Sequence, residues 1–364
     1  MNASHTSGTS RASHAFHVES HDSLEAVREV WAGLARDSRA PLFHHPPYLD
    51  AYAAAPLHHI ARTSYLLARD RDGAARAALP LFHQPEMDPL GVLRHQLPAR
   101  PGTGAEGGAG AGSGLLSHVW HCYDTRILAR GPLTAPLLDA LLDAAHRIAR
   151  DGGAQWYGLV NVEAPGALAT ALDRAAPDRG MCRVRVDERF TADLRRHPTA
   201  DAFVASLRPR QRQRLRRYGR RAAEAGLATR VVDPREADLD GLLELVRATM
   251  AKFGATSFFP EGLFQRFVTA LGDRARIIEQ RLDGRLIGGA ACLVDEERLH
   301  FWISGVDYGA APTFSPNYLL FLEGIHEALR RGVPVFEGGR RNGPFKELFG
   351  LRGRPLLAYV APVG

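Results

Sequence analysis

The sequence predicts a mixed α+β protein made of two similar halves. Each half contains helices, then a run of short strands joined by tight turns, and then a strand–helix–strand unit. The chain has 364 residues, enough for two domains, and its 45% apolar and 24% charged residues are ordinary for a soluble globular protein. We therefore expect a duplicated architecture in which each half has a central, mostly antiparallel sheet flanked by helices.

The first half opens with residues 1–15, which are rich in Ser, Thr and His and which we expect to be a disordered tail. A helix is expected after Asp22 or Ser23, since either side chain can cap its first turn. Two alternating segments flank Asp72 and Gly73, a pair typical of β-hairpin turns. The other expected elements are a loop leading into a short helix (42–55), a flexible glycine-rich loop (101–114), a strand-like segment (117–128), an amphipathic helix (136–150) and a buried strand (155–162).

The second half repeats this order after a boundary expected near 195–202. We place the two domains at 16–198 and 199–364. An arginine-rich helix is expected over 202–225, ending before Gly226. The other expected elements are helices at 238–253, 264–271 and 316–331 and strands at 275–284, 285–295, 298–307 and 333–336.

Arginine is concentrated in one segment. Residues 207–221 contain eight arginines and no acidic residue, so this segment accounts for the net charge of +6. Arg210, Arg214, Arg217 and Arg221 recur along one face of the expected helix. Guanidinium groups pair well with phosphates, and helical arginine rows are common where proteins contact RNA. The pattern predicts a surface that binds a polyanion; the alternative is a solvated helix whose arginines pair with acids elsewhere.

Several classes of site are disfavoured. Cys122, Cys182 and Cys292 are far apart, which argues against a disulfide framework or a cysteine zinc site, and we expect no metal. No run of about 20 apolar residues occurs, so we expect a cytoplasmic protein that does not enter a membrane. Residues 285–290 match the R-x-x-G-x-A loop that holds coenzyme A, but they lie inside an expected strand. Residues 102–107 match G-x-G-x-x-G without the strand and helix that this motif requires.

The segment 335–350 (VFEGGRRNGPFKELFG) combines a strand end, a glycine turn and one of the two lysines of the chain. Sites usually lie at such strand ends. Together with SGVDYGAAPTFSPNYLLFLEGIHEALRRGV and RQRQRLRRYGRRAAEAGL, this segment resembles the Fem-like branch of the GNAT acyltransferase superfamily. Within that branch, the double-GNAT peptidoglycan biosynthesis/recognition proteins and the tRNA-dependent aminoacyltransferases of natural-product pathways are the most similar. The resemblance covers about 202–358, and LFHHPPYLDAYA supports it in the first half.

The resemblance implies two tandem GNAT-like domains, with the acceptor bound between them or against the first, and transfer of an activated acyl group to an amine. The long helical hairpin of true Fem ligases is missing, which favours a small amine of secondary metabolism over a cell-wall peptide. We therefore expect aminoacyl-tRNA as the donor, tRNA as the partner and no separate cofactor. The alternatives are an acyl-coenzyme A donor on the same fold and a GNAT-like binding module without catalysis.

The expected donor side lies in the same segment. The resemblance places Phe345 and Lys346 beside the acyl donor. Lys346 is expected to stabilise the oxyanion or the departing ribose oxygen, and Glu337 to orient the lysine or accept a proton. The alternative for Glu337 and Lys346 is a salt bridge. The phosphates of the donor are expected to meet Arg210, Arg214, Arg217, Arg221 and Arg340.

The expected acceptor side is formed by two groups of residues. His121, Tyr123 and Asp124 follow the glycine-rich loop, and a buried structural cluster is the alternative for them. Asp307 and Tyr308 end a strand, and a turn-capping aspartate is the alternative there.

Overall fold

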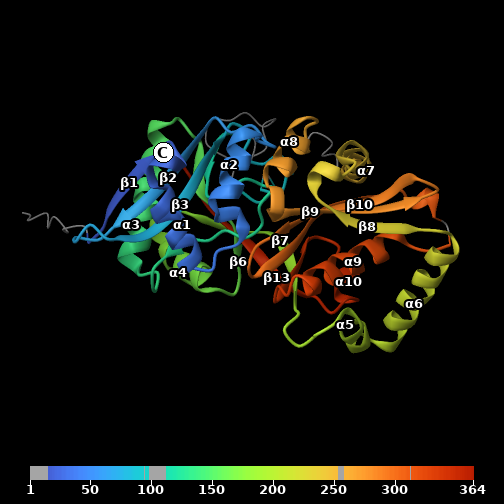
Figure 1. Ribbon diagram of the computed structural model, residues 1–364. Coiled ribbons are helices and arrows are strands. Elements are labelled where there is room, and N and C mark those ends of the chain that lie inside the picture. The colour runs from blue at the N-terminus through green and yellow to red at the C-terminus, as the bar shows by residue number, and fades with distance from the viewer. Residues whose placement is uncertain (1–14, 94, 98–111, 253–257, 312) are drawn as a thin grey trace, which may run out of the picture.

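The computed structural model describes residues 15–93, 95–97, 112–252, 258–311 and 313–364 (Figure 1). The expected tail and most of the glycine-rich loop lie outside these residues. Gly114, the last residue of that expected loop, already belongs to a strand.

Within the described residues, one mixed sheet contains strands from both halves, in the order β1-β2-β3-β4-β6-β13-β7-β12-β11-β10-β9-β8, with β5 beside β3. The strands are β1 (His17–His21), β2 (Arg62–Arg69), β3 (Ala75–Gln84), β4 (Gly114–Leu116), β5 (Leu128–Ala129), β6 (Trp156–Glu163), β7 (Cys182–Asp193), β8 (Ala228–Val232), β9 (Ala275–Leu282), β10 (Arg285–Val294), β11 (Arg298–Val306), β12 (Val335–Arg340) and β13 (Arg352–Pro362).

The order of the strands reveals the duplication. Counted inward from its two ends, the sheet has equivalent strands in the two halves. β1 corresponds to β8, β2 to β9, and so on to β13 and β7, the two strands that meet at its centre. The parallel pairs, β4 with β6 and β11 with β12, occupy equivalent places in the two halves. The final strand of each half is inserted into the other half, because β13 lies between β6 and β7 while β7 lies between β13 and β12. The two expected sheets are therefore joined into one.

Helices cover both faces of this sheet (Figure 1). One face carries α1 (Arg28–Asp37), α2 (Pro46–Ala54), α7 (Leu239–Ala251) and α8 (Leu263–Ala270), whose apolar side chains share one core across both halves. The other face carries α3 (Ala135–Asp151) and α4 (Ala167–Ala175) over the first half. Over the second half it carries α5 (Ala200–Ser206), α6 (Pro209–Glu224), α9 (Pro316–Arg330) and α10 (Gly343–Glu347).

Much of the local structure follows the expected signals. The expected hairpin forms as β2 and β3, where Gly73 takes a positive φ of 78° in the turn. Helix α3 and strand β6 match the expected 136–150 and 155–162 within a residue or two. Residues 285–290, which match the coenzyme A-binding motif R-x-x-G-x-A, lie in β10, as expected.

Besides the joining of the two sheets, the structure corrects two expectations about local structure. The arginine-rich helix expected over 202–225 is two helices, α5 and α6, because Pro209 has no amide hydrogen and forces Arg208 into an extended conformation (φ −58°, ψ 144°). The strand-like segment 117–128 is mostly irregular, and only Leu128 belongs to a strand. It is held by side chains instead: Thr125 Oγ1 donates to the main-chain oxygen of Val160, and Asn161 Nδ2 donates to that of Cys122.

Candidate active site

The candidate site lies where β11 and β12 separate. The two strands pair in parallel from Arg298 and Val335 to His300 and Glu337, and beyond this point β12 keeps only its other neighbour, β7, with which it pairs from Val335 to Arg340. The chain then turns sharply through Arg341 and Asn342, whose φ angles are 61° and 53°, and enters α10. This turn brings α10 and Lys346 back over the sheet.

Lys346 is almost completely buried. Its Nζ donates to the main-chain oxygen of Arg340 at 2.6 Å and lies 5.2 Å from the centre of the Phe190 ring. Gly343 permits this approach, because an added Cβ would lie 2.7 Å from Cζ of Phe190. Burial lowers the pKa of Lys346 to about 7, although the negative charges of Glu337 and Asp187 partly oppose this shift. At neutral pH the group is therefore divided between amine and ammonium.

Glu337 is fully buried and pairs with Arg189 of β7 rather than with Lys346. Arg189 Nε donates to Glu337 Oε1 at 3.1 Å, and Nη2 also contacts Oε2. In the described part of the chain, no ion pair within 4 Å joins Glu337 to Lys346, so the salt bridge considered from the sequence is not formed. Glu337 acts on the lysine through its charge and not through contact.

Arg189 joins the two halves of the protein. Its Nη1 lies 2.5 Å from Asp124 Oδ2 and 3.1 Å from Glu163 Oε2, both in the first half, while Glu337 belongs to the second. Burial alone lowers the pKa of Arg189, but the three carboxylates raise it well above its usual value. For Asp124 the effects are reversed. Burial raises the pKa of this carboxyl group, but the positive charges of Arg189 and Arg126 outweigh burial and hold the pKa well below its usual range. Asp124 and Arg189 are therefore both charged at neutral pH.

The irregular segment 117–125 of the first half packs against the separated strands. Arg340 Nη2 donates to the main-chain oxygen of Trp120 at 2.9 Å, and its guanidinium lies 5.8 Å from the centre of the Tyr123 ring. Trp302 Nε1 donates to the main-chain oxygen of His121 at 2.8 Å. The first half thus forms one wall of the site.

The acceptor candidates on this wall differ in hydrogen bonding. Both ring nitrogens of His121 are engaged, Nδ1 with Tyr52 Oη at 3.1 Å and Nε2 with the Phe258 oxygen at 2.7 Å, and the ring stacks on Phe258. Direct contact with a substrate would require these bonds to break. The buried Tyr123 hydroxyl, in contrast, has no hydrogen-bond partner among the described residues. Neither ring nitrogen of the neighbouring His118, a residue not identified from the sequence, has one there either.

Asp307 and Tyr308 lie elsewhere. Asp307 is seven residues beyond His300 along β11, a distance of roughly 23 Å at 3.3 Å per residue. It accepts a hydrogen bond from Gly309 N and pairs with Arg285 at 3.0 Å. Tyr308 is exposed, with Lys252 over its ring, and both residues line a hollow of about 630 Å³ beside α7. The structure does not bring them together with Lys346.

The predicted arginine face is present on α6. Arg214 Nη1 donates to Tyr318 Oη at 2.9 Å and Arg221 Nη1 to the Thr313 oxygen at 2.9 Å, so both point toward the start of α9. Within the described residues, no carboxylate lies within 4 Å of Arg210, Arg214 or Arg217, so these three do not pair with acids elsewhere. A hollow of about 480 Å³ on this face is lined by Arg210, Gln213, Arg214, Arg216, Arg217 and Arg220.

Phe345 and the residues after Lys346 lie between these features. The ring of Phe345 packs on Tyr318 and Phe321, with ring centroids 4.9 and 5.2 Å apart.

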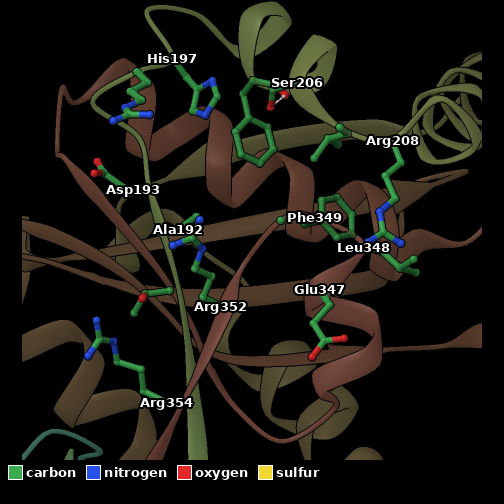
Figure 2. Close-up of a pocket in the computed structure, with 15 residues that line it drawn as sticks. Ala192, Asp193, His197, Ser206, Arg208, Glu347, Leu348, Phe349, Arg352 and Arg354 are labelled. Atoms are coloured by element: carbon green, nitrogen blue, oxygen red, sulfur yellow. Dashed lines mark hydrogen bonds between the residues drawn. The ribbon is translucent and has the colours of Figure 1, made fainter. Parts of the chain in front are cut away.

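Glu347 and Leu348 line a further hollow of about 650 Å³ between α5, α10, β7 and β13 (Figure 2). This hollow was not anticipated from the sequence, since its lining comes from three stretches of the chain, 191–197, 203–208 and 347–354.

The described residues contain neither a membrane-spanning helix nor a cluster of metal ligands. No helix among them is both long enough and apolar enough to cross a bilayer. In the same residues, no group of three or more His, Cys, Asp and Glu side chains is arranged to hold a metal ion.

Residues 209–347 match the family described as acetyltransferase (GNAT) domain. The fold of the whole chain is similar to the crystal structure of FemX, with a TM-score of 0.61 and 11% identity over 94% of this chain and 97% of that chain. It is also similar to a tandem GNAT protein from the clavulanic acid biosynthesis pathway, with a TM-score of 0.58 and 15% identity over 96% and 99%.

A third similar structure is the C-terminal domain of a putative lysylphosphatidylglycerol synthetase from Agrobacterium fabrum, with a TM-score of 0.51 and 14% identity over 94% and 92% of the two chains. A sequence search among curated proteins finds no match. At these identities the likeness is one of fold, and it supports the tandem arrangement inferred from the strand order.

Proposed function

We propose that this chain, which has a Fem-like tandem GNAT fold with a GNAT domain at residues 209–347, transfers an aminoacyl group from aminoacyl-tRNA to an amine. The GNAT domain supports an acyltransferase. The observation that carries the choice of donor is the arginine face of α6, where a hollow is lined by five arginines and no acid. Such a surface suits an RNA backbone, because phosphate contacts provide most of the affinity in nucleic-acid binding.

The chemistry needs little acid–base machinery, because the ester of an aminoacyl-tRNA is already activated. The neutral acceptor amine attacks the ester carbonyl, a tetrahedral intermediate forms, and the bond to the ribose oxygen breaks. Lys346 in its ammonium form stabilises the oxyanion and gives a proton to the departing ribose oxygen, while its amine form accepts a proton from the attacking nitrogen. A pKa of about 7 makes both forms available.

The other residues position these groups. Glu337 opposes the fall in the lysine pKa through its charge, and Arg189 holds Glu337 in place. The acceptor amine binds between segment 117–125 and the separated strands, where the Tyr123 hydroxyl is free to hydrogen-bond to it. Because charged tRNA is a cytoplasmic substrate, we assign the reaction to the cytoplasm, with a small amine of secondary metabolism as acceptor and no separate cofactor.

Acyl-coenzyme A is the second candidate donor, because the matching family is described as an acetyltransferase. Against it, the R-x-x-G-x-A motif lies within β10 and does not open a helix, where pyrophosphate usually binds. A binding module without catalysis is the third possibility, and it predicts no turnover with either donor.

Product analysis distinguishes these functions. The protein is incubated with a panel of amines and either pooled charged tRNA or pooled acyl-coenzyme A, and the products are identified by mass spectrometry. We expect aminoacylated amines in the tRNA reaction, abolished when the tRNA is first digested with ribonuclease. Products only in the coenzyme A reaction would contradict the proposal, and the Lys346→Ala variant controls for uncatalysed transfer.

A further inference from the structure

The hollow beside α10 has a strongly basic lining. Figure 2 shows Arg352 and Arg354 along β13, His197 and Ser206 above them, and Arg208 beside Leu348. Arg196 and Phe203 also line it. The hollow therefore gathers four arginines and a histidine from segments that are distant in the sequence.

Most of this positive charge is not neutralised by the protein. Within the described residues, no carboxylate lies within 4 Å of Arg196, Arg208 or Arg352, and Arg354 approaches Glu163 only to 3.6 Å. Of the two acids in the lining, Asp193 is engaged by Arg195 at 3.4 Å, which leaves Glu347. Three guanidinium groups without a carboxylate partner outnumber the one remaining carboxylate, which favours an anionic ligand, and their planar form suits phosphate.

The hollow lies at the N-terminal end of α6, since Arg208 is the residue that precedes this helix. Arg208 lines this hollow, and Arg210, two residues later, lines the hollow on α6. The first turn of α6 contains no acidic residue, so an anion bound beside Arg208 would also offset the positive end of that helix. The start of α6 thus offers positive charge to a phosphate chain at the edge of this hollow.

Size and position indicate which part of a nucleic acid fits. A hollow of about 650 Å³ accommodates a small-molecule-sized group and not a duplex. Its lining includes Phe349, Phe203 and the His197 ring, which packs edge-on against Phe203, and such side chains commonly contact unpaired bases. Lys346 and Glu347 are adjacent in the chain, so the hollow lies within about one helix diameter, ~10 Å, of the lysine.

We propose that this hollow binds the phosphodiesters and bases of the single-stranded 3′ end of the donor RNA and directs the acylated terminus to Lys346. This assignment rests on the proposed function, since it deepens the description of the same donor. It separates two tasks: α6 holds the RNA duplex, and the hollow holds the unpaired end.

The test compares two RNA hairpins, one with a single-stranded 3′ extension and one with a blunt end, in binding titrations at several salt concentrations. Arg208→Gln and Arg352→Gln should each weaken binding of the extended hairpin about tenfold and lower its salt slope by about 0.7, the value for one single-stranded phosphate. The blunt hairpin should bind both variants as it binds the wild type. Arg147→Gln, an exposed arginine of α3 with no ion pair among the described residues, is the matched control.

Equal losses for both hairpins, or no loss for either, would overturn the assignment while leaving the duplex contact of α6 intact. Failure of the wild type to bind any hairpin would instead refute the tRNA donor itself. A thermal shift with coenzyme A that disappears in Arg352→Gln would assign the hollow to a coenzyme phosphate and overturn the RNA assignment.

Discussion

Lys346 Nζ donates to the main-chain oxygen of Arg340 at 2.6 Å, across the turn that connects β12 to α10. The turn passes through two non-glycine residues of positive φ, so its conformation is specific and not a generic loop. The lysine is thus fixed to the end of the strand that carries Glu337, yet it forms no ion pair with that residue. Its chemistry and its contribution to folding can therefore be measured separately.

Replacing Lys346 tests the chemical role. Lys346→Ala should lower kcat by about 10²–10³, as expected for loss of one preorganised charged group, and leave RNA affinity unchanged. Lys346→Arg should also be poorly active, because a planar guanidinium does not fit the place of a compact ammonium. The Tm of Lys346→Met, which fills most of the same buried space and leaves no carboxylate without a partner, should stay near or above that of the wild type. Normal turnover of Lys346→Ala and Lys346→Arg would exclude a catalytic role for Lys346.

The buried lysine also predicts a pH-dependent stability. Its pKa falls from 10.5 to about 7 on folding, so between these values the unfolded chain binds more protons at this position than the folded chain. Ionisation of Lys346 therefore destabilises the protein fully below about pH 7 and not at all above about pH 10.5. Urea unfolding should show Lys346→Met gaining stability relative to the wild type as the pH falls through this window. A constant difference at all pH values would contradict the shift.

The Arg189 cluster should be important for folding. Arg189→Met would leave Glu337 buried without its arginine partner and Asp124 with Arg126 alone, and breaking one partner of such a cluster typically costs about 3–5 kcal/mol. We expect a loss of this size in urea unfolding. The double variant Arg189→Met/Glu337→Gln should recover part of it, because one unpaired charge is removed. A loss below about 1 kcal/mol would show that water or other groups replace the arginine.

The arginine face of α6 predicts a salt-dependent RNA affinity. With about four phosphates neutralised, log K should fall with log salt at a slope near −3, and replacing Arg210, Arg214 and Arg217 with Gln should flatten it by about 0.7–0.9 per residue. The variant should remain folded, because the buried side of α6, Leu215 and Ala222, is unchanged. An unchanged slope would place the RNA contact on another surface.

Tyr123 offers a test of the acceptor side. Tyr123→Phe removes a buried hydroxyl that has no partner among the described residues, so the free energy of unfolding should not fall. If the acceptor uses this hydroxyl, KM for the amine should rise about tenfold with kcat nearly unchanged. A KM equal to that of the wild type would remove Tyr123 from the acceptor site.

Local signals in the sequence predicted the elements that depend on neighbouring residues. The hairpin of β2 and β3 and the helix α3 follow from alternation, turn residues and helical spacing. The central strands β7 and β13 were not predicted. β7 carries charged residues at many positions, and β13 contains Pro355, a residue unusual inside a sheet, which is tolerated beside a register shift. Their pairing partners are distant in the sequence, so no local pattern reports them.

In the candidate site too, some residues could be identified from the sequence and others only from the fold. Lys346 and Glu337 stand out in the sequence because lysine is rare and a strand ends nearby. Arg189, the true partner of Glu337, belongs to no motif, and the partner of Lys346 is a main-chain oxygen, which every residue possesses. Only the fold reveals Arg189 as this partner, because β7 and β12 meet through the exchange at the centre of the sheet.

That exchange has a consequence for biosynthesis. The first half is translated long before β13, the strand that lies between β6 and β7. Until β13 is made, the edges of β6 and β7 that pair with it have amide and carbonyl groups without a partner. The nascent first half therefore cannot complete its own sheet, and its folding ends only when the last strand of the second half arrives. The two halves mature together, and the intermediate that precedes this step is the form of the protein most exposed to aggregation.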